Sequence, residues 1–225
     1  LNPMLSPKGR IMGDFTVACL DEKRFQVTAS FGAQAYHMRW FEDHLSDDDV
    51  KLENVSKQRI GFQIAGPRAQ QLLASITRAD VSSAAFPFLS VREIDVGQFQ
   101  AIVQRVSYTG DRGYEIYVPW HHQAGLYHLL TEAGKDLGLR PFGMRAMMSL
   151  RLDKFFGSWG REFSPDYTPC ETGLDRFIRW NKDADWIGKA PAMAEKAAGA
   201  KRTLCAFVVD AKDADVVAWE PVWID

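Results

Sequence analysis

Glu115 is the residue of this 225-residue chain whose surroundings point most directly to chemistry. It follows the glycine-bounded turn 109–113 and lies among aromatic neighbours, Tyr114 and Tyr117, in a run typical of a β-strand. An ionised carboxylate makes strong hydrogen bonds with neighbouring donors, and aromatic rings pack well against flat molecules. This combination suits the binding of a flat heterocycle with an amide-like edge.

The period of the strand also allows a simpler interpretation of Glu115. Alternation places Tyr114, Ile116 and Val118 on one face and Glu115 with Tyr117 on the other. Half-buried antiparallel strands normally alternate in this way, so on period alone a solvated Glu115 is an equal alternative.

Other common kinds of site are not indicated. The five histidines lack the spacing of metal ligands, since two are adjacent and three are isolated (His121 and His122; His37, His44 and His128). The segment 66–68 lacks the glycine spacing of a phosphate loop, and no Gly-x-Gly-x-x-Gly motif is present. We therefore expect no metal, nucleotide or flavin to be bound by this portion itself.

Composition narrows the class of partner. With 46% apolar residues the chain can bury a sizeable core, and its net charge of −2 offers no basic field for nucleic acid. The acidic run 47–49 is most simply a solvated loop. We predict a globular protein that does not bind nucleic acid.

Cysteine usage and hydropathy bear on location. Cys19, Cys170 and Cys205 are far apart, which suggests neither a disulfide framework nor a zinc site and fits a reducing compartment. No apolar run reaches the roughly 18 residues needed to cross a bilayer, and the first residues do not form a signal-peptide pattern. We expect a cytoplasmic protein with no membrane partner.

Strands and helices are mixed along the chain. Strands are expected within 15–30, at 60–65, 91–96, 100–108 and 114–118, and in the late run 204–210. Helices are expected at 33–45, after Gly66-Pro67, at 121–138 and at 145–154. Their buried stripes are predicted as Ala35, Met38, Phe41 and Leu45; Ala69, Leu72, Leu73 and Ile76; and Ala124, Leu126, Tyr127, Leu130 and Ala133. This order predicts an α+β fold with antiparallel sheets covered by helices.

Five segments stand out in order along most of the chain. They are 4–17, a glycine-containing hairpin that ends in Asp14 and an apolar strand; 106–119, around Glu115; 143–154, Gly-Met-Arg-Ala-Met-Met-Ser-Leu-Arg-Leu-Asp-Lys; the late loop 159–162 with 167–174; and 186–189, Trp-Ile-Gly-Lys. Together they resemble the aminomethyltransferase family, which includes the T-protein of the glycine cleavage system and the folate domains of dimethylglycine and sarcosine dehydrogenases.

The resemblance implies a folate-binding aminomethyltransferase-like fold in three parts. We expect a partial first α+β subdomain at 1–57, a second with the folate-site motifs at 58–175, and a connection leading into a C-terminal β domain at 176–225. Family members carry a segment before this start and a fuller β domain after it, so the chain is expected to be truncated at both ends.

The resemblance also implies an enzyme that transfers a methylene or methyl group from a small amine-type donor to tetrahydrofolate. Glu115 matches the family residue that binds the pterin edge. Arg145 matches the residue whose guanidinium fork holds the carboxylate tail, and its alternative is a helix-start arginine paired with a nearby acid. Arg151 is the more typical structural arginine of this pair.

Asp14 matches the family aspartate beside the reactive nitrogen, where a carboxylate stabilises developing positive charge or orients the departing proton. By its position alone, after Gly13, it is more typical of a turn. Glycine cleavage members commonly carry an acid where this chain has Gly13, so the chain resembles the dehydrogenase-linked branch more.

Tyr108 and Trp159 complete the candidate residues. Tyr108 is expected to pack on the pterin or to hydrogen-bond Asp14, and Trp159 to form an aromatic wall. For both residues, core packing is an equal alternative.

Two other functions stay open. The chain can be the folate-binding portion of a flavin-dependent dimethylglycine or sarcosine dehydrogenase, with an oxidase or dehydrogenase domain as partner. It can also be a non-catalytic folate-binding assembly protein, although the loop 156–162 lacks the cysteine typical of those relatives. The sequence does not identify the one-carbon donor.

Overall fold

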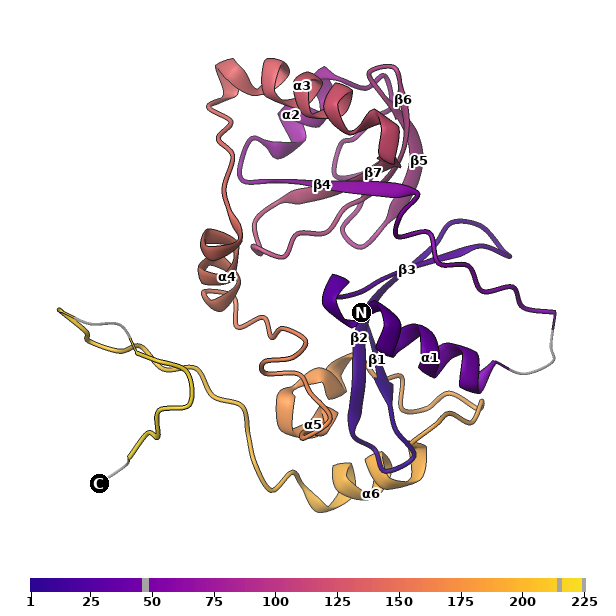
Figure 1. Ribbon diagram of the computed structural model, residues 1–225, viewed down its shortest axis with the longest axis vertical. Helices are drawn as coiled ribbons and strands as arrows, with labels where there is room; N and C mark the ends of the chain where they lie inside the picture. Colours follow the sequence, from indigo (N-terminus) through magenta and orange to yellow (C-terminus); the bar gives the residue numbers. More distant parts are fainter. Residues whose placement is uncertain (46–48, 214–215, 224–225) are drawn as a thin grey trace.

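Two antiparallel β-sheets organise the chain. The computed structural model describes residues 1–45, 49–213 and 216–223. One sheet has three strands in the order β1-β2-β3, and the other has four in the order β4-β7-β6-β5. Helices cover these sheets, so the α+β class predicted from the sequence is confirmed (Figure 1).

The first sheet begins with a hairpin. Strands β1 (Asn2–Leu5) and β2 (Ile11–Cys19) pair antiparallel around a turn in which Gly9 adopts φ 74°. Strand β3 (Phe25–Thr28) pairs with the far end of β2. The glycine allows the left-handed turn that most residues avoid, so the family-like hairpin is present as expected.

Helix α1 (Gln34–His44) comes after this sheet but buries a different side chain from the one predicted. His37 is buried, whereas Ala35 and Leu45 are exposed and Met38 and Phe41 are half-buried. The apolar stripe was wrong because Phe15 and Trp159 pack their rings against His37 and draw the imidazole inward.

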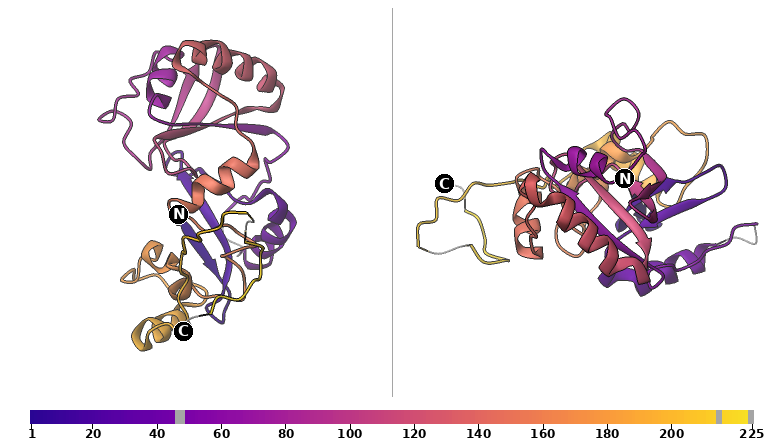
Figure 2. Two further views of the ribbon diagram at one scale, coloured as in Figure 1. Left: turned by 90° about the vertical axis from the view of Figure 1, so that its left-hand side faces the viewer. Right: turned by 90° about the horizontal axis from the view of Figure 1, so that it is seen from above.

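The second sheet carries the larger core. It comprises β4 (Arg59–Ala65), β5 (Val91–Val96), β6 (Phe99–Gln104) and β7 (Gly113–Pro119). Helices α2 (Ala69–Ser75) and α3 (Gln123–Gly134) cover one face, as Figures 1 and 2 show from three directions. Their buried side chains pack with those of the strands in one cluster.

Periodicity predicted one of these two helices better than the other. All four residues of the α2 stripe are buried, which confirms that prediction. In α3, Leu126 and Leu130 are buried as expected, but Ala124 and Tyr127 are exposed. Tyr127 instead packs at the rim, with its ring centroid 6.4 Å from that of Phe62.

The connection between β6 and β7 is longer than the predicted tight turn. Strand β6 ends at Gln104, and β7 begins at Gly113. The segment 106–108 was predicted as strand, but it belongs to the connecting loop, where the hydroxyl of Ser107 lies 2.9 Å from that of Thr109 and 3.4 Å from the amide nitrogen of Gln63.

A smaller cluster lies beside β1 and β2. It includes α5 (Pro169–Thr172), a 3-10 turn at 174–177 and α6 (Lys189–Ala198), while α4 (Met144–Leu152) lies on the connection from the second sheet to this part. Buried Leu5, Ile11, Phe163, Leu174 and Ala192 make up this core.

A capping box closes the start of α5 and contacts the C-terminal segment. Thr168 and Glu171 exchange side-chain to backbone hydrogen bonds, and Arg202 donates to Glu171 at 2.8 Å. Beyond Arg202 the chain is extended. The strand predicted at 204–210 is absent from these described residues, because no partner strand there supplies ladder hydrogen bonds.

The predicted acidic loop is described only at its end. Asp47 and Asp48 lie outside the described residues, while Asp49 is exposed. Within the described ranges, no helix has the length and apolarity required to cross a membrane.

Candidate functional site

Glu115 lies in the middle of β7, in a row of polar side chains. It pairs with Gln63 of β4 on one side and with Gln104 of β6 on the other. Directly opposite residues of antiparallel strands project from the same face. We call this surface of the sheet, with Gly61, Ile102 and Tyr117, the polar face.

The opposite surface of β7 belongs to the core. Tyr114, Ile116 and Val118 have no exposed area, and they pack under α2 and α3. The predicted alternation is therefore confirmed, with Glu115 and Tyr117 half-buried on the polar face. Glu115 is not a solvated strand residue.

Tyr117 is the hydrogen-bond partner of Glu115. Its hydroxyl donates to Oε2 of the carboxylate at 2.5 Å. Burial raises the pKa of Glu115, and this hydrogen bond lowers it again in part. Burial, followed by the neighbouring Glu115, raises the pKa of Tyr117 above its ordinary range.

Gln104 adds a polar group that has no partner. The residue is 2% exposed, and in the described part of the chain its amide nitrogen makes no hydrogen bond. An unsatisfied buried donor is costly. Here it lies across the strand pair from a carboxylate, so the row offers both acceptor and donor groups, as the edge of an amide-like heterocycle requires.

Asp14 lies within β2 and not in a turn. It is half-buried, and burial raises its pKa to about 6. Its carboxyl group can therefore gain or lose a proton near neutral pH, which is what a group that handles a proton during a reaction needs.

Tyr108 lies near Asp14 but does not hydrogen-bond it. Its hydroxyl donates to the backbone oxygen of Gly157 at 2.7 Å. Burial is the main reason that the pKa of Tyr108 is raised, and the charges of Asp14 and Glu162 raise it further. The Tyr108 hydroxyl therefore bonds the loop 156–162 and not Asp14, as one alternative had expected.

A buried ion pair holds that loop in place. Arg151 is 3% exposed and donates to Glu162 at 2.8 Å and to the oxygen of Phe156 at 2.7 Å. Glu162 in turn accepts from the backbone of Ser158 at 3.0 Å. Arg151 therefore has the structural role expected of it.

Trp159 on the same loop is packed against other aromatic rings. Its ring centroid is 5.1 Å from that of His37 and 5.9 Å from that of Tyr36. The surrounding cluster is the core beside β1 and β2. These contacts favour the core-packing alternative, and a role as a ligand wall stays a prediction.

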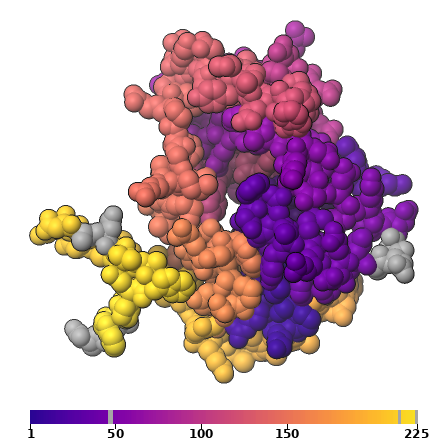
Figure 3. Space-filling model, viewed as in Figure 1, coloured from indigo at the N-terminus to yellow at the C-terminus, as the bar shows by residue number. Residues whose placement is uncertain are grey.

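Arg145 is exposed in the first turn of α4, and the described residues form no ion pair with it. The alternative in which it pairs with a neighbouring acid is therefore not supported. Figure 3 shows the surface hollowed between α4 and the N-terminal strands.

Sequence reasoning gave no role at the site to three residues around it. Tyr117 had a usable signal, because alternation places it on the face of Glu115, whereas Gln104 reaches that face only through the register of β6 with β7. His37 had a weaker one: Gly13 leaves room for it, since a Cβ there would lie 3.0 Å from its Nε2. His37 is 3% exposed, and neither ring nitrogen has a partner among the described residues.

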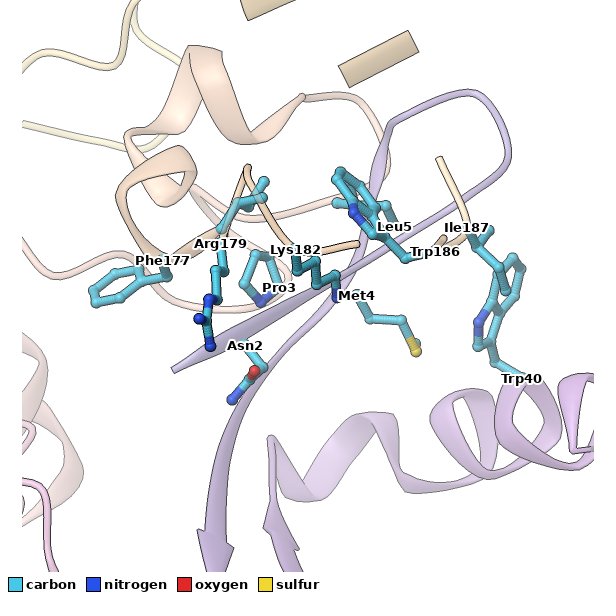
Figure 4. A pocket seen from close by; sticks show the side chains of 11 residues that line it. Asn2, Pro3, Met4, Leu5, Trp40, Phe177, Arg179, Lys182, Trp186 and Ile187 are labelled. Atoms are coloured by element: carbon cyan, nitrogen blue, oxygen red, sulfur yellow. The ribbon is translucent and has the colours of Figure 1, made fainter. Parts of the chain in front are cut away.

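A separate cavity of about 270 Å³ lies between the start of β1, Trp40 of α1 and the segment 177–187 (Figure 4). Its side chains are mainly apolar and aromatic, with two cations, Arg179 and Lys182. None of the five candidate residues lines it. The cavity therefore does not belong to the site around Glu115.

Comparisons with known proteins show the family of this chain. Residues 1–182 match the family model described as the GCVT N-terminal domain. Dimethylglycine dehydrogenase, mitochondrial, from Homo sapiens is 34% identical over 99% of this chain and 26% of its own length. An aminomethyltransferase from Natranaerobius thermophilus is 30% identical over 91% of this chain and 56% of its own length.

A solved structure shares the fold. Glycine cleavage system aminomethyltransferase T from Bartonella henselae superposes with a TM-score of 0.74 at 24% identity, covering 88% of this chain and 52% of that one. The chain thus spans between about a quarter and about half of these proteins.

Proposed function

Because this chain belongs to the GCVT N-terminal domain family, we propose that it binds tetrahydrofolate and supports transfer of a one-carbon unit to it from a small amine-type donor. The observation that carries the proposal is the half-buried carboxylate of Glu115 in a polar row of an otherwise packed sheet. A buried carboxylate without a cation is expensive, and a ligand edge with two adjacent donors would offset that cost.

The polar face offers a hydrogen-bonding group for each polar group on the edge of a pterin. Glu115 would accept from the adjacent ring and amino N–H groups, and the unpartnered amide nitrogen of Gln104 provides a donor beside it. The exposed guanidinium of Arg145 would meet the anionic glutamate tail. Tetrahydrofolate itself supplies the nucleophilic ring nitrogen that takes up the carbon unit.

Asp14 is the proposed catalytic residue. A carboxyl group with a pKa of about 6 can hold a proton or a negative charge at neutral pH. It can therefore take the proton that leaves the reacting nitrogen and stabilise positive charge that develops there. Tyr108, held by its hydrogen bond to Gly157, lies near this carboxyl group.

A second function is favoured by one finding. The match to dimethylglycine dehydrogenase covers 99% of the chain. We propose as the alternative that the chain is the folate-binding portion of a flavin-dependent dehydrogenase, which oxidises the donor in another domain. A dinucleotide-binding glycine motif in the same reading frame upstream would decide for this version.

The first test is a calorimetric titration of 5-formyltetrahydrofolate into the 225-residue chain and its Glu115→Gln variant. We expect saturable binding that the substitution weakens at least tenfold, the scale of a hydrogen bond to a charged group. Glu132→Gln is the control, because Glu132 lies exposed on α3, which covers the opposite face of the sheet. It should bind as the parent does.

The failing result is equally specific. A folded parent chain that binds no folate would refute the proposed function. Equal binding by the parent and Glu115→Gln would remove Glu115 from the site and leave the location of the ligand to be found elsewhere.

A further inference from the structure

We propose that Tyr117 is a positioning residue for Glu115 and that the missing side chain at Gly61 makes room for the Tyr117 ring, so that two neighbouring strands together set the ligand-binding carboxylate. The link to a folate ligand rests on the proposed function. The positioning itself concerns the chain alone and can be tested without any ligand.

Tyr117 and Glu115 project from the same face of β7 and are joined by a short hydrogen bond. The two residues are separated by one position in β7 and so project from the same face. The hydroxyl lies 2.5 Å from Oε2, the range of a hydrogen bond to a charged oxygen. This bond fixes the rotation of the carboxylate and leaves Oε1 for another donor.

The backbone of the neighbouring strand is shaped for this ring. Gly61 of β4 lies directly opposite Tyr117, and a Cβ at Gly61 would approach Cε1 of the tyrosine to 2.8 Å. Any other residue at this position would displace the ring. Because Gly61 has no side chain, the Tyr117 ring can occupy this space and its hydroxyl can reach Glu115.

Strand β3 of the first sheet approaches this polar face. Thr28 lies near enough to the hydroxyl of Tyr117 to lower its pKa, against the larger effects of burial and of Glu115. The ion pair between Arg24, just before β3, and Glu93 of β5 joins the same two sheets.

Charged groups do not compete with this hydrogen bond for control of Glu115. The residues that face it are Gln63 from β4, Gln104 from β6 and Tyr117 from its own strand. In the described part of the chain, register places Arg59 of β4 with Glu93 and Asp95 of β5 on the same face, and none of these charges is among the causes of the pKa shift of Glu115. Only Tyr117 offsets burial in setting the pKa of Glu115.

The direct test is a carboxyl ¹³C NMR titration of the ligand-free chain, with the Glu115 signal assigned from Glu115→Gln. In Tyr117→Phe the ionised carboxylate loses its donor, so its midpoint should rise by about one pH unit. Tyr114→Phe is the matched control, because that hydroxyl is buried on the opposite face of β7 and has no hydrogen-bond partner among the described residues.

Binding of 5-formyltetrahydrofolate between about pH 5 and 8 gives the second measurement. Ionised Glu115 is the binding form, so affinity falls as pH drops through its pKa. For Tyr117→Phe we expect the fall at higher pH and affinity about tenfold weaker near neutral pH, with the Tyr114→Phe profile unchanged.

The two measurements separate the possible failures. An unmoved Glu115 midpoint in a folded Tyr117→Phe variant overturns the positioning role, whatever the ligand result. A shifted midpoint in a chain that binds no folate supports the positioning role and refutes the proposed function. Equal shifts in Tyr117→Phe and Tyr114→Phe indicate a general loosening of β7 and also overturn it.

Discussion

The two faces of strand β7 are built by alternate residues and have opposite properties. The face under α2 and α3 is apolar and fully buried at Tyr114, Ile116 and Val118. The polar face places a carboxylate with a raised pKa next to an amide that lacks a partner among the described residues. One face therefore supplies the free energy of folding, and the other retains costly groups that only a ligand would make worthwhile.

Ile116→Ala is the largest test of this division. Removing a fully buried side chain from the core should lower the free energy of unfolding by about 2–5 kcal/mol. Chemical denaturation would measure the loss, and titration under conditions where the variant stays folded would show folate affinity close to that of the parent. A fall in affinity as large as the loss of stability would break the comparison.

Asp14→Asn tests how much the burial of a charged carboxylate in β2 lowers the free energy of unfolding. The pKa of Asp14 is about 6 in the folded chain and 3.8 when unperturbed, so its charge is disfavoured by folding. Its stabilising contribution is complete below about pH 4 and is lost as pH rises through about 6. Relative to Asp14→Asn, the parent should lose about 2 kcal/mol across this window, after allowance for partial exposure.

Denaturation curves at intervals from about pH 4 to about pH 7 would measure the difference. The exposed Asp111 provides the control, since Asp111→Asn should match the parent at every pH. Parallel curves for the parent and Asp14→Asn would show that the carboxyl group is not penalised by burial.

Arg145→Gln should give the smallest effect and would sharpen the comparison. An exposed arginine that pairs with a ligand carboxylate in water contributes at most about 1 kcal/mol, or about fivefold in affinity. The loss should appear for folates with a glutamate tail and vanish for a tetrahydropterin without one. Arg140→Gln, also exposed, should change neither; an equal loss for both ligands would place Arg145 away from the tail.

The sequence predicted those features that depend on local pattern. The alternation around Glu115 and the buried stripe of α2 were confirmed, because β7 and α2 pack against each other in one core and each buries the face that its own period predicts. The stripe of α1 was wrong at His37, whose burial depends on Phe15 and on the much later Trp159. No local period contains that contact.

In the candidate site, too, features set by local pattern were predictable and features set by tertiary contacts were not. The face of Glu115 can be predicted from the strand period, but its donor cannot, because a tyrosine two positions away is as common in a core as at a site. The place of Gln104 beside Glu115 and the fit of the Tyr117 ring against Gly61 arise only when separate strands are brought together. Tertiary placement therefore supplies the electrostatics, and the sequence supplies the groups.

Gly61 has a consequence for how this family of sequences can vary. The space beside its Cα is filled by the ring of Tyr117, so positions 61 and 117 form one mutational unit. A side chain can enter at 61 only after the residue at 117 becomes smaller, and that exchange removes the donor from the carboxylate at 115. Relatives with a larger residue at 61 should therefore carry a smaller one at 117. In a library that varies both positions, folded variants should be those in which a larger residue at 61 accompanies a smaller one at 117. Folate affinity should be kept only by the pair Gly61 and Tyr117.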